Sequence, residues 1–360
     1  MGGQDIYIYL RNGETDIAYM LKKGSITVEL NAHDSFEIED DNFIFGTPEI
    51  LLSESDGFNH FRNFSVKAHP DTDYVRIPAK TVFQMISSYK VGFAMAKAIA
   101  EILVNVNTIL TKKKNEVGEK ERLTQEYCKI FAWAADAVAT HYQKKRFPWL
   151  EPICNNARAS LTYAKGSAFS SFDQKTKFEI ASTEVDEFSK VFPPGATICN
   201  QGDMGDELYI LKAGKLKVLI DDTPIAEIED PGSVIGEMAL LLGQVRNATI
   251  KAVEEAILTV VKKSNLKDFA TANPDFLKTI STDLSRRVTH NCAVVNDLDE
   301  IIESSKMEDN SLPSALRENK YKEELKDLKD SIKKLYEKYD MEWLYDLVSD
   351  ITEKMLDVRK

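Results

Sequence analysis

Two charged residues in the second half of the chain stand among small neighbours at a fixed separation. The stretch from Gly236 to Ile250 reads G-E-M-A-L-L-L-G-Q-V-R-N-A-T-I, and Glu237 precedes Arg246 by nine residues. Gly236 permits a close approach of backbone to a ligand, and the planar fork of an arginine matches two oxygens of a phosphate. Ala248 leaves space beside the arginine and offers a backbone N–H. These residue types at this spacing indicate a site for a small phosphate-bearing ligand.

The glutamate needs a separate explanation, because a carboxylate beside a phosphate is repelled unless it has another task. A short helix that begins near Gly236 would direct its first amide groups and the positive end of its dipole at the phosphate. Glu237 would then be free to accept a hydrogen bond from a hydroxyl group. In a 3′,5′-cyclic nucleotide, the ribose hydroxyl lies close to the phosphate. One ligand of this class accounts for the glycine, the glutamate, the arginine and the alanine.

At these residues the sequence resembles the cyclic nucleotide-binding domain superfamily, which includes cAMP receptors and the regulatory subunits of protein kinase A. The phosphate-binding cassette of that family has the form G-E-x-A-L followed by R-x-A-S/T. The matching residues are Gly236, Glu237, Ala239, Leu240, Arg246, Ala248 and Thr249, and the turn glycines of the family appear as Gly195, Gly202 and Gly214. The resemblance covers about residues 183–289 and, more faintly, residues 4–110.

The resemblance implies a role for each residue of the cassette. Glu237 would accept a hydrogen bond from the ribose 2′-hydroxyl, and Arg246 would pair with the cyclic phosphate. Backbone groups of Gly236, Met238, Ala239 and Ala248 would complete the cradle, and Ile235 and Val245 would form apolar walls. The expected ligand-binding set is Ile235, Gly236, Glu237, Met238, Ala239, Val245, Arg246, Asn247, Ala248 and Thr249. No catalytic residue and no metal ligand is expected.

The identity of the base is less constrained than the cassette. In this family the residue after the arginine is often Thr in cGMP-selective members and Ala in many cAMP receptors, whereas here it is Asn247. The ligand is therefore cAMP or cGMP, with cAMP favoured by family frequency alone. A barrel that keeps the fold and has lost its ligand is the alternative. A barrel without a ligand would keep Glu237 and Arg246 buried and unpaired, which costs free energy and argues against this alternative.

A comparison of the chain with itself reveals a repeat. Residues 13–28 parallel residues 203–218 at a constant offset of 190, and the coinciding pairs are Asp16 and Asp206, Tyr19 and Tyr209, Leu21 and Leu211, Lys22 and Lys212, Gly24 and Gly214, and Val28 and Val218. The offset persists at Gly46 and Gly236 and falls to 184 at Arg62 and Arg246, so six extra residues lie within residues 47–61. The chain therefore contains two copies of one domain.

The first copy departs from the cassette pattern. Thr47 aligns with Glu237, Phe64 replaces Ala248, and Glu49 follows a proline two residues beyond the aligned position. The ring of Phe64 would intrude on a phosphate, so a structural or dimer-forming role is favoured over a changed ligand. The first copy also lacks a counterpart to residues 183–190.

Both copies show short strands separated by turn residues, at 207–212, 215–220, 224–228 and 257–261 in the second copy. This pattern predicts a jelly-roll barrel, followed by helices near residues 81–110 and 264–295. A break is expected at Asn273-Pro274-Asp275. Within the second of these helices, the kinase-site pattern Arg286-Arg287-Val288-Thr289 is better explained by helix periodicity.

The rest of the chain is predicted to be helical. Residues 111–181 contain an alanine-rich stretch, interpreted as a helical spacer or a single helix-hairpin module. The carboxyl-terminal seam of Tyr321, Leu325, Leu328, Ile332, Leu335 and Tyr339 fits either a coiled coil or a helix packed on its own chain. The expected class is α+β, with a degenerate domain at 1–110, a helical linker at 111–181, a cyclic nucleotide-binding domain at 182–295 and a helical tail at 296–360.

Composition excludes several other classes of protein. The formal net charge of -12 argues against a nucleic-acid partner. No apolar run of about 20 residues is evident, so no membrane partner is expected. The four cysteines, Cys128, Cys154, Cys199 and Cys292, lie far apart and predict reduced thiols in a cytoplasm. The sequence contains no phosphate-binding loop of the form G-x-x-x-x-G-K-S/T, no kinase motif set, no cyclase signature and no histidine-based catalytic triad. It therefore gives no indication of an enzyme.

We therefore expect a cytoplasmic, non-enzymatic cyclic-nucleotide receptor that signals through movement of the helices after the second barrel. An unidentified protein effector is an expected partner, and a homodimer is considered because helices flanking such barrels often pair. The alternative is a scaffold that uses both barrels and the helices for protein contacts. A kinase regulatory subunit is disfavoured because no R-R-x-A/S stretch precedes the domains.

Overall fold

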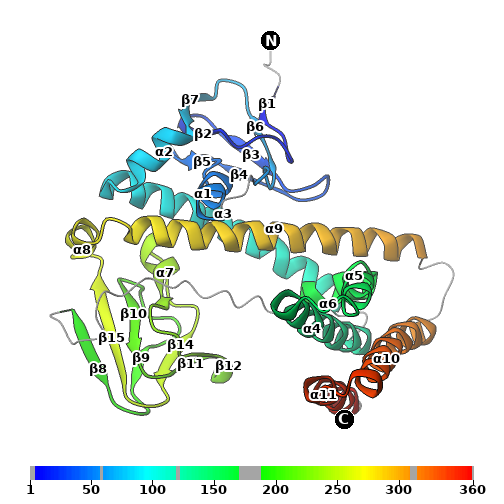
Figure 1. Ribbon diagram of the computed structural model, residues 1–360. Coiled ribbons are helices and arrows are strands. Elements are labelled where there is room, and N and C mark those ends of the chain that lie inside the picture. Colours follow the sequence, from blue (N-terminus) through cyan, green and yellow to red (C-terminus); the bar gives the residue numbers. More distant parts are fainter. Residues whose placement is uncertain (1–4, 57–59, 119–121, 170–187, 309–313, 359–360) are drawn as a thin grey trace. The chain divides into compact units, whose positions relative to one another are not determined.

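The computed structural model describes residues 5–56, 60–118, 122–169, 188–308 and 314–358 (Figure 1). The chain divides into two compact units. The first unit combines residues 1–106 with residues 173–292 and contains both strand-built domains, and the second combines residues 107–172 with residues 293–360. The helical region between the barrels and the carboxyl-terminal tail therefore belong to one unit.

The first barrel consists of two antiparallel sheets. One has the order β1-β6-β3-β4 and the other the order β5-β2-β7. The strands are β1 (Ile6–Tyr9), β2 (Ile17–Lys23), β3 (Ile26–Glu29), β4 (Ser35–Ile38), β5 (Ile44–Phe45), β6 (Ser65–Ala68) and β7 (Asp73–Pro78). Helix α1 (Pro48–Asp56) lies between β5 and β6, and it contains most of the described part of the six-residue insertion.

The second barrel repeats this plan with one further strand. Its sheets have the orders β12-β11-β14-β9 and β13-β10-β15-β8. The elements are β8 (Ser189–Phe192), β9 (Thr197–Cys199), β10 (Glu207–Ala213), β11 (Leu216–Ile220), β12 (Thr223–Ile228), β13 (Val234–Ile235), α7 (Glu237–Leu242), β14 (Thr249–Ala252) and β15 (Ala256–Lys262). Strand β8 pairs with β15 and has no counterpart in the described part of the first barrel. Residues 183–187 of the expected extra segment lie outside the described residues.

Irregularities of the backbone recur at equivalent positions and support the repeat. The register of β2 against β7 shifts between Leu21 and Lys23, and that of β10 against β15 shifts between Leu211 and Ala213. The next residues, Gly24 and Gly214, have φ angles of 92° and 93°, which only glycine adopts without strain. The prediction of two barrels within an α+β fold is confirmed.

Each barrel is followed by helices, as the periodicity predicts. Helices α2 (Ala79–Ile86) and α3 (Tyr89–Gly118) follow the first barrel, and α8 (Leu266–Ala272) and α9 (Phe276–Glu308) follow the second. The expected break at Asn273-Pro274-Asp275 separates α8 from α9. Both α3 and α9 extend past the predicted ends, because each leaves the first unit and continues into the helical unit.

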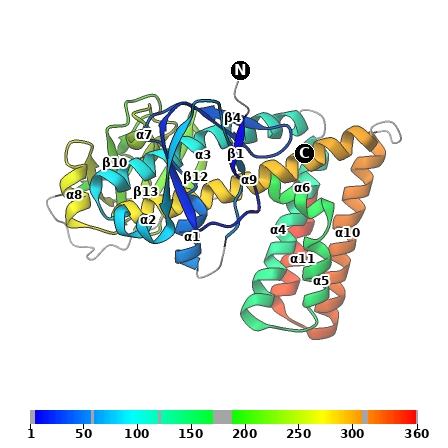
Figure 2. The same ribbon diagram turned by 90° about the horizontal axis from the view of Figure 1, so that it is seen from above.

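The helical unit is built around a single apolar cluster. Figure 2 shows α4 (Arg122–Lys145), α5 (Glu151–Arg158), α10 (Ser314–Tyr339) and α11 (Glu342–Asp357) side by side, and α6 (Leu161–Phe169) also packs against α4. A Cβ atom on Gly166 would lie 1.9 Å from the carbonyl oxygen of Cys128, so α6 and α4 are in backbone contact at this glycine. The alanine-rich sequence of α4 is suited to such close packing.

The seam of the tail packs against its own chain. Tyr321, Leu325, Leu328 and Ile332 of α10 are buried in the cluster together with Leu347 and Ile351 of α11. Ring stacking between Trp149 and Tyr339, with centroids 4.3 Å apart, joins the end of α10 to the segment before α5. Of the two interpretations of the seam, the structure supports packing within the chain.

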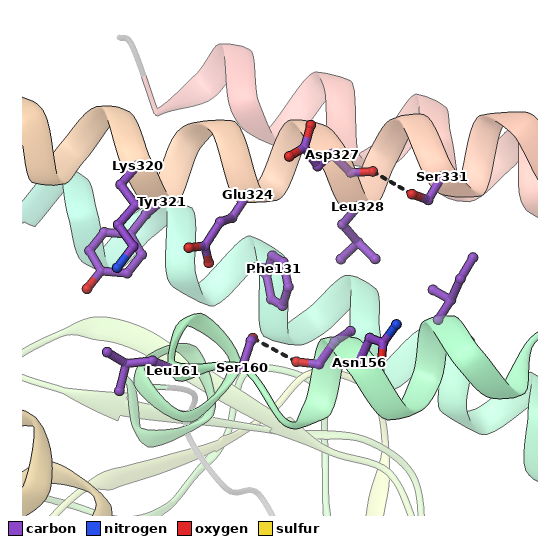
Figure 3. A pocket seen from close by; sticks show the side chains of 12 residues that line it. Phe131, Asn156, Ser160, Leu161, Lys320, Tyr321, Glu324, Asp327, Leu328 and Ser331 are labelled. Carbon is purple, nitrogen blue, oxygen red and sulfur yellow. Dashed lines mark hydrogen bonds between the residues drawn. The ribbon is translucent and has the colours of Figure 1, made fainter.

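A groove remains open beside this cluster. It has a volume of about 380 Å³, and Figure 3 shows it between α10 and the turn that joins α5 to α6, with Phe131 of α4 behind it. Its walls are mixed, because Phe131, Leu161 and Leu328 are apolar whereas Lys320 and Glu324 are charged.

The expectation that no apolar stretch is long enough to span a membrane is wrong by length and composition. Residues 89–117 of α3 meet both criteria. In the structure, 44% of the most apolar stretch of this helix is buried inside the protein. One such helix is weak evidence for a membrane span, since the core helix of a soluble protein passes the same test.

We expect Leu325→Ala to lower the free energy of unfolding of the helical unit by about 2–5 kcal/mol, because Leu325 is fully buried in its cluster. The three tryptophans of the chain, Trp133, Trp149 and Trp343, all lie in this unit, so urea unfolding followed by tryptophan fluorescence reports on it alone. Leu356→Ala is the matched control, since Leu356 is 55% exposed, and its unfolding midpoint should stay close to that of the wild type. Equal effects of both variants would contradict the packing described here.

Candidate functional site: the cassette of the second barrel

The predicted cassette folds as strand, turn, short helix and strand. Strand β13 ends at Ile235, and Gly236 then takes a left-handed conformation with a φ angle of 80°. Helix α7 starts at Glu237, and the first amide groups of a helix have no intrahelical acceptor. No side-chain cap supplies one here. A Cβ atom on Gly236 would lie 2.2 Å from Nη1 of Arg246. Glycine is therefore required both by the backbone angle and by the approach of the arginine.

Arg246 is buried and has no acidic partner. Its side chain is 5% exposed, Nη1 donates to the carbonyl oxygen of Gly236 at 3.0 Å, and Nη2 donates to that of Glu207. The guanidinium lies 5.4 Å from the centroid of the Tyr209 ring, and its Nε has no hydrogen-bond partner among the described residues. Within that same part of the chain, no carboxylate forms an ion pair with Arg246. Burial of a cation without an anion is unfavourable, so this position favours an anionic ligand.

Glu237 is also buried, and helix α9 supplies its partner. The carboxylate is 7% exposed, and Oε1 accepts a hydrogen bond of 2.7 Å from Nη1 of Arg287. Arg287 also lies 3.9 Å from Asp283, one turn earlier on α9. The sequence analysis missed Arg287 as a site residue because 50 residues separate it from Glu237 and no local spacing links them.

The remaining predicted residues divide into two groups. Ile235 and Ala239 are buried and Gly236, Met238, Ala248 and Thr249 are half-buried, so these residues accompany Glu237 and Arg246. Val245 is 47% exposed and forms an isolated bridge with Met204, and Asn247 is exposed. The structure thus does not place Val245 as a wall of the interior. Thr249 accepts a hydrogen bond from the backbone N–H of Gln201 at 2.9 Å.

A cavity of about 580 Å³ opens beside Arg246. Glu207 and Tyr209, which contact the arginine, line it together with Phe192, Val260 and Lys262. Its walls come from β8, β10 and β15 and from residues next to them, and none of the cassette residues 235–249 is part of its lining. Burial, with a further contribution from the Glu207 carboxylate, raises the pKa of Tyr209 well above its usual value. The phenol is therefore a neutral hydrogen-bonding group at ordinary pH.

The corresponding region of the first barrel is filled by aromatic rings. Tyr9 occupies the position of Cys199, Phe64 that of Ala248 and Phe45 that of Ile235. The ring of Tyr9 lies 4.4 Å from the Arg62 guanidinium, 5.7 Å from the Tyr19 ring and 6.3 Å from the Phe64 ring. These side chains take the space that the smaller residues of the second barrel leave open.

Arg62 of the first barrel has the anion that Arg246 lacks. Its Nη1 lies 3.5 Å from Oε2 of Glu49, and the other carboxylate oxygen accepts a hydrogen bond of 3.0 Å from the backbone N–H of Asn63. Both side chains of the ion pair are buried, at 1% and 0% exposure. Although Glu49 is displaced in the alignment, helix α1 brings its carboxylate to the arginine. The first barrel therefore contains its own internal anion.

Comparison with known proteins identifies the second barrel. Residues 189–273 match the family model described as "Cyclic nucleotide-binding domain". These residues form a cyclic nucleotide-binding domain. A cyclic nucleotide-gated potassium channel of Rhizobium etli is 33% identical over 99 residues, which are 27% of this chain and 27% of the channel. The cGMP-dependent protein kinase of Plasmodium berghei is 56% identical over 63 residues, which are 18% of this chain and 7% of the kinase.

These matches therefore span about a quarter or less of the length of those relatives. Among solved structures, the regulatory domain of Toxoplasma gondii PKA with cAMP aligns at 13% identity and a TM-score of 0.23, over 76% of this chain and 82% of that one. Within the described residues, no group of three or more His, Cys, Asp or Glu side chains is arranged to hold a metal ion.

We expect Arg62→Met to destabilise the first barrel by about 3–5 kcal/mol, because it leaves the buried Glu49 carboxylate without its cation. The double variant Arg62→Met/Glu49→Gln removes both charges and should recover part of that loss. Native-state hydrogen exchange of the β2 and β6 amides measures the effect. A double variant that is less stable than Arg62→Met would show that the ion pair does not govern this interior.

Proposed function

We propose that the protein is a non-enzymatic cyclic-nucleotide receptor whose ligand binds in the second barrel. The observation that carries this proposal is the buried Arg246 guanidinium, which has no acidic partner in the described chain. The equivalent Arg62 is neutralised by Glu49, so the fold supplies an anion where no ligand is needed. A cyclic phosphate would supply the missing charge in the second barrel.

The roles proposed for the other residues follow from their positions. Glu237 would accept from the ribose 2′-hydroxyl through the oxygen that Arg287 does not use, since a carboxylate has acceptor sites for several donors. Backbone groups of Gly236, Met238, Ala239 and Ala248 would surround the phosphate. Cys199 and Ala248 leave the interior open where Tyr9 and Phe64 close it in the first barrel.

The base is proposed to be adenine, with guanine retained as the competitor. The preference for cAMP rests on family frequency, and Asn247 matches neither of the usual residues at its position. The similarity to a cGMP-dependent kinase of Plasmodium berghei favours testing cGMP on equal terms.

We further propose that ligand capture shifts the position of α9 and so transmits the signal to a protein effector. Helix α9 follows the second barrel, holds Arg287 against Glu237 and continues into the helical unit. A ligand shifts such an equilibrium only by its differential affinity for the two arrangements. A cytoplasmic location and a homodimer belong to the same proposal, and the four buried cysteine thiols are compatible with a reducing compartment.

We expect isothermal titration of the purified protein with cAMP and with cGMP to show one site per chain. Arg246→Ala should weaken binding by about 10–100-fold, because charge-assisted hydrogen bonds to the phosphate are lost. The Arg62→Met/Glu49→Gln variant, which alters the other barrel, should weaken binding far less than Arg246→Ala, because it removes no contact to the phosphate. Two sites per chain, or equal losses in both variants, would contradict the assignment of the ligand to the second barrel.

The alternative function, a scaffold without nucleotide, is favoured by one observation. The groove beside α10 is lined by apolar side chains and by Lys320, Glu324 and Asp327, which fits a protein segment with both apolar and polar residues (Figure 3). The titration separates the two functions. No heat and no competition with either nucleotide would remove the receptor proposal for these ligands and leave the scaffold.

A further inference from the structure

Helix α9 contacts the cassettes of both barrels. Towards the second barrel, Arg287 binds Glu237 at 2.7 Å. Towards the first barrel, Nζ of Lys278 lies 3.1 Å from Glu54, and Nη2 of Arg286 donates to Oγ of Ser55 at 2.6 Å. Glu54 and Ser55 are in the last turn of α1, the helix that carries Glu49 in the degenerate cassette.

A third polar contact joins α9 to the residue that follows Arg62. The side-chain amide of Asn63 donates to Oγ1 of Thr289 at 2.8 Å. The backbone N–H of Asn63 binds the Glu49 carboxylate, so the internal anion of the first barrel fixes the residue that receives α9. The first barrel thus offers α9 a surface formed by Glu54, Ser55 and Asn63, which we call the α9 platform.

Buried groups extend this contact. Cys292 of α9 is 2% exposed, and burial together with the nearby Glu49 carboxylate raises the pKa of its thiol. Leu277 of α9 packs on α3, since a Cβ atom on Gly92 would lie 3.1 Å from its Cδ1. The helix is therefore in apolar as well as polar contact with the part of the chain that belongs to the first barrel.

Lys278, Thr289 and Cys292 lie on a different face of α9 from the residues that reach Glu237, whereas Arg286, which reaches Ser55, lies between the two faces. At about 100° per residue, Lys278, Thr289 and Cys292 fall within roughly 60° of one another around the helix axis. Asp283 and Arg287 fall on the other side of that axis. Lys278 and Thr289 are therefore suitable positions for substitution, because neither lies on the face of α9 that reaches Glu237.

We propose that the α9 platform of the first barrel is an intramolecular binding surface for α9, and that docking of α9 there and nucleotide capture in the second barrel stabilise each other. The coupling half of this proposal rests on the proposed function. Docked α9 holds Arg287 against Glu237, which orients the carboxylate and offsets its repulsion of a phosphate. Arg287 is thus a positioning residue.

The same geometry explains why the first barrel keeps its arginine. The Arg62 and Glu49 pair holds α1 and Asn63 in place without a ligand, so the α9 platform is preformed. A preformed surface loses less conformational entropy when a helix docks on it. Because coupling between two binding events is reciprocal, nucleotide in the second barrel tightens docking by the same factor by which docking tightens nucleotide binding.

A charge swap tests the α9 platform and its coupling. Lys278→Glu places two carboxylates opposite each other and should weaken nucleotide binding by about 3–5-fold, the range expected of an exposed ion pair. The double variant Lys278→Glu/Glu54→Lys restores opposite charges and should recover wild-type affinity. Lys267→Glu on α8 is the control, because it makes the same charge change at an exposed lysine away from these contacts.

A second pair of variants tests the buried side of the surface. Thr289→Val keeps the shape of the side chain and removes the acceptor for Asn63, whereas Thr289→Ser retains it. We expect Thr289→Val to weaken binding of cAMP or cGMP, whichever the wild type binds, and Thr289→Ser to behave as the wild type. Equal affinities of Lys278→Glu, Thr289→Val and the wild type would overturn the coupling.

Hydrogen exchange without nucleotide tests the docking by itself. The amides of α1 should exchange faster in Lys278→Glu and in Thr289→Val than in the wild type, and at the wild-type rate in the charge-swapped variant. Unchanged exchange of α1 in both single variants would overturn the α9 platform. If the wild type binds neither nucleotide, the proposed function and the coupling fail together, whereas this exchange experiment still decides whether α9 docks on the first barrel.

Discussion

A buried guanidinium must be matched by an anion, and both barrels are organised around that requirement. In the first barrel the chain supplies the anion itself, because Glu49 lies on α1 within ion-pair distance of Arg62. In the second barrel Arg246 has backbone carbonyls and an aromatic ring around it, and none of the described carboxylates forms an ion pair with it. The same constraint is met within the chain in the first copy, and it is the basis for the ligand site that we propose in the second.

The difference between the copies comes from few substitutions at equivalent positions. Tyr9 and Phe64 fill the space that Cys199 and Ala248 leave open, so large rings replace small side chains next to the arginine. Helix α1 carries Glu49 near its start, and its longer carboxyl end offers Glu54 and Ser55 to α9. The substitutions therefore fill the interior of the first copy, and the insertion adds residues that contact α9.

The long helices explain why the units do not follow the order of the chain. Helix α3 leaves the first unit after Val106 and α9 leaves it after Cys292, and each continues into the helical unit. The tail helices α10 and α11 bury their apolar faces against α4, because an amphipathic helix is stabilised chiefly by packing. A seam such as that of Leu325 and Ile332 specifies which face is apolar but not which partner covers it.

The sequence by itself determined the features that depend on local spacing. The cassette from Gly236 to Thr249, the repeat at an offset of 190 residues and the break before α9 follow from residue types a few positions apart or from their recurrence. These features can be predicted from the sequence because local geometry requires particular residue types, such as a glycine where the φ angle is positive or an arginine beside the start of a helix. The departure of the first copy from the cassette pattern was evident in Thr47 and Phe64 for the same reason.

Only the tertiary structure decided the features that join distant residues. It placed Arg287 on Glu237, brought Glu49 to Arg62 despite its shifted position, left Val245 exposed and united the linker with the tail in one unit. Each of these depends on how a helix packs after the chain has turned, and burial selects among contacts that the sequence permits equally. Packing decides which residues become ionic or apolar partners when tens of residues separate them. The periodicity of the sequence does not predict that packing.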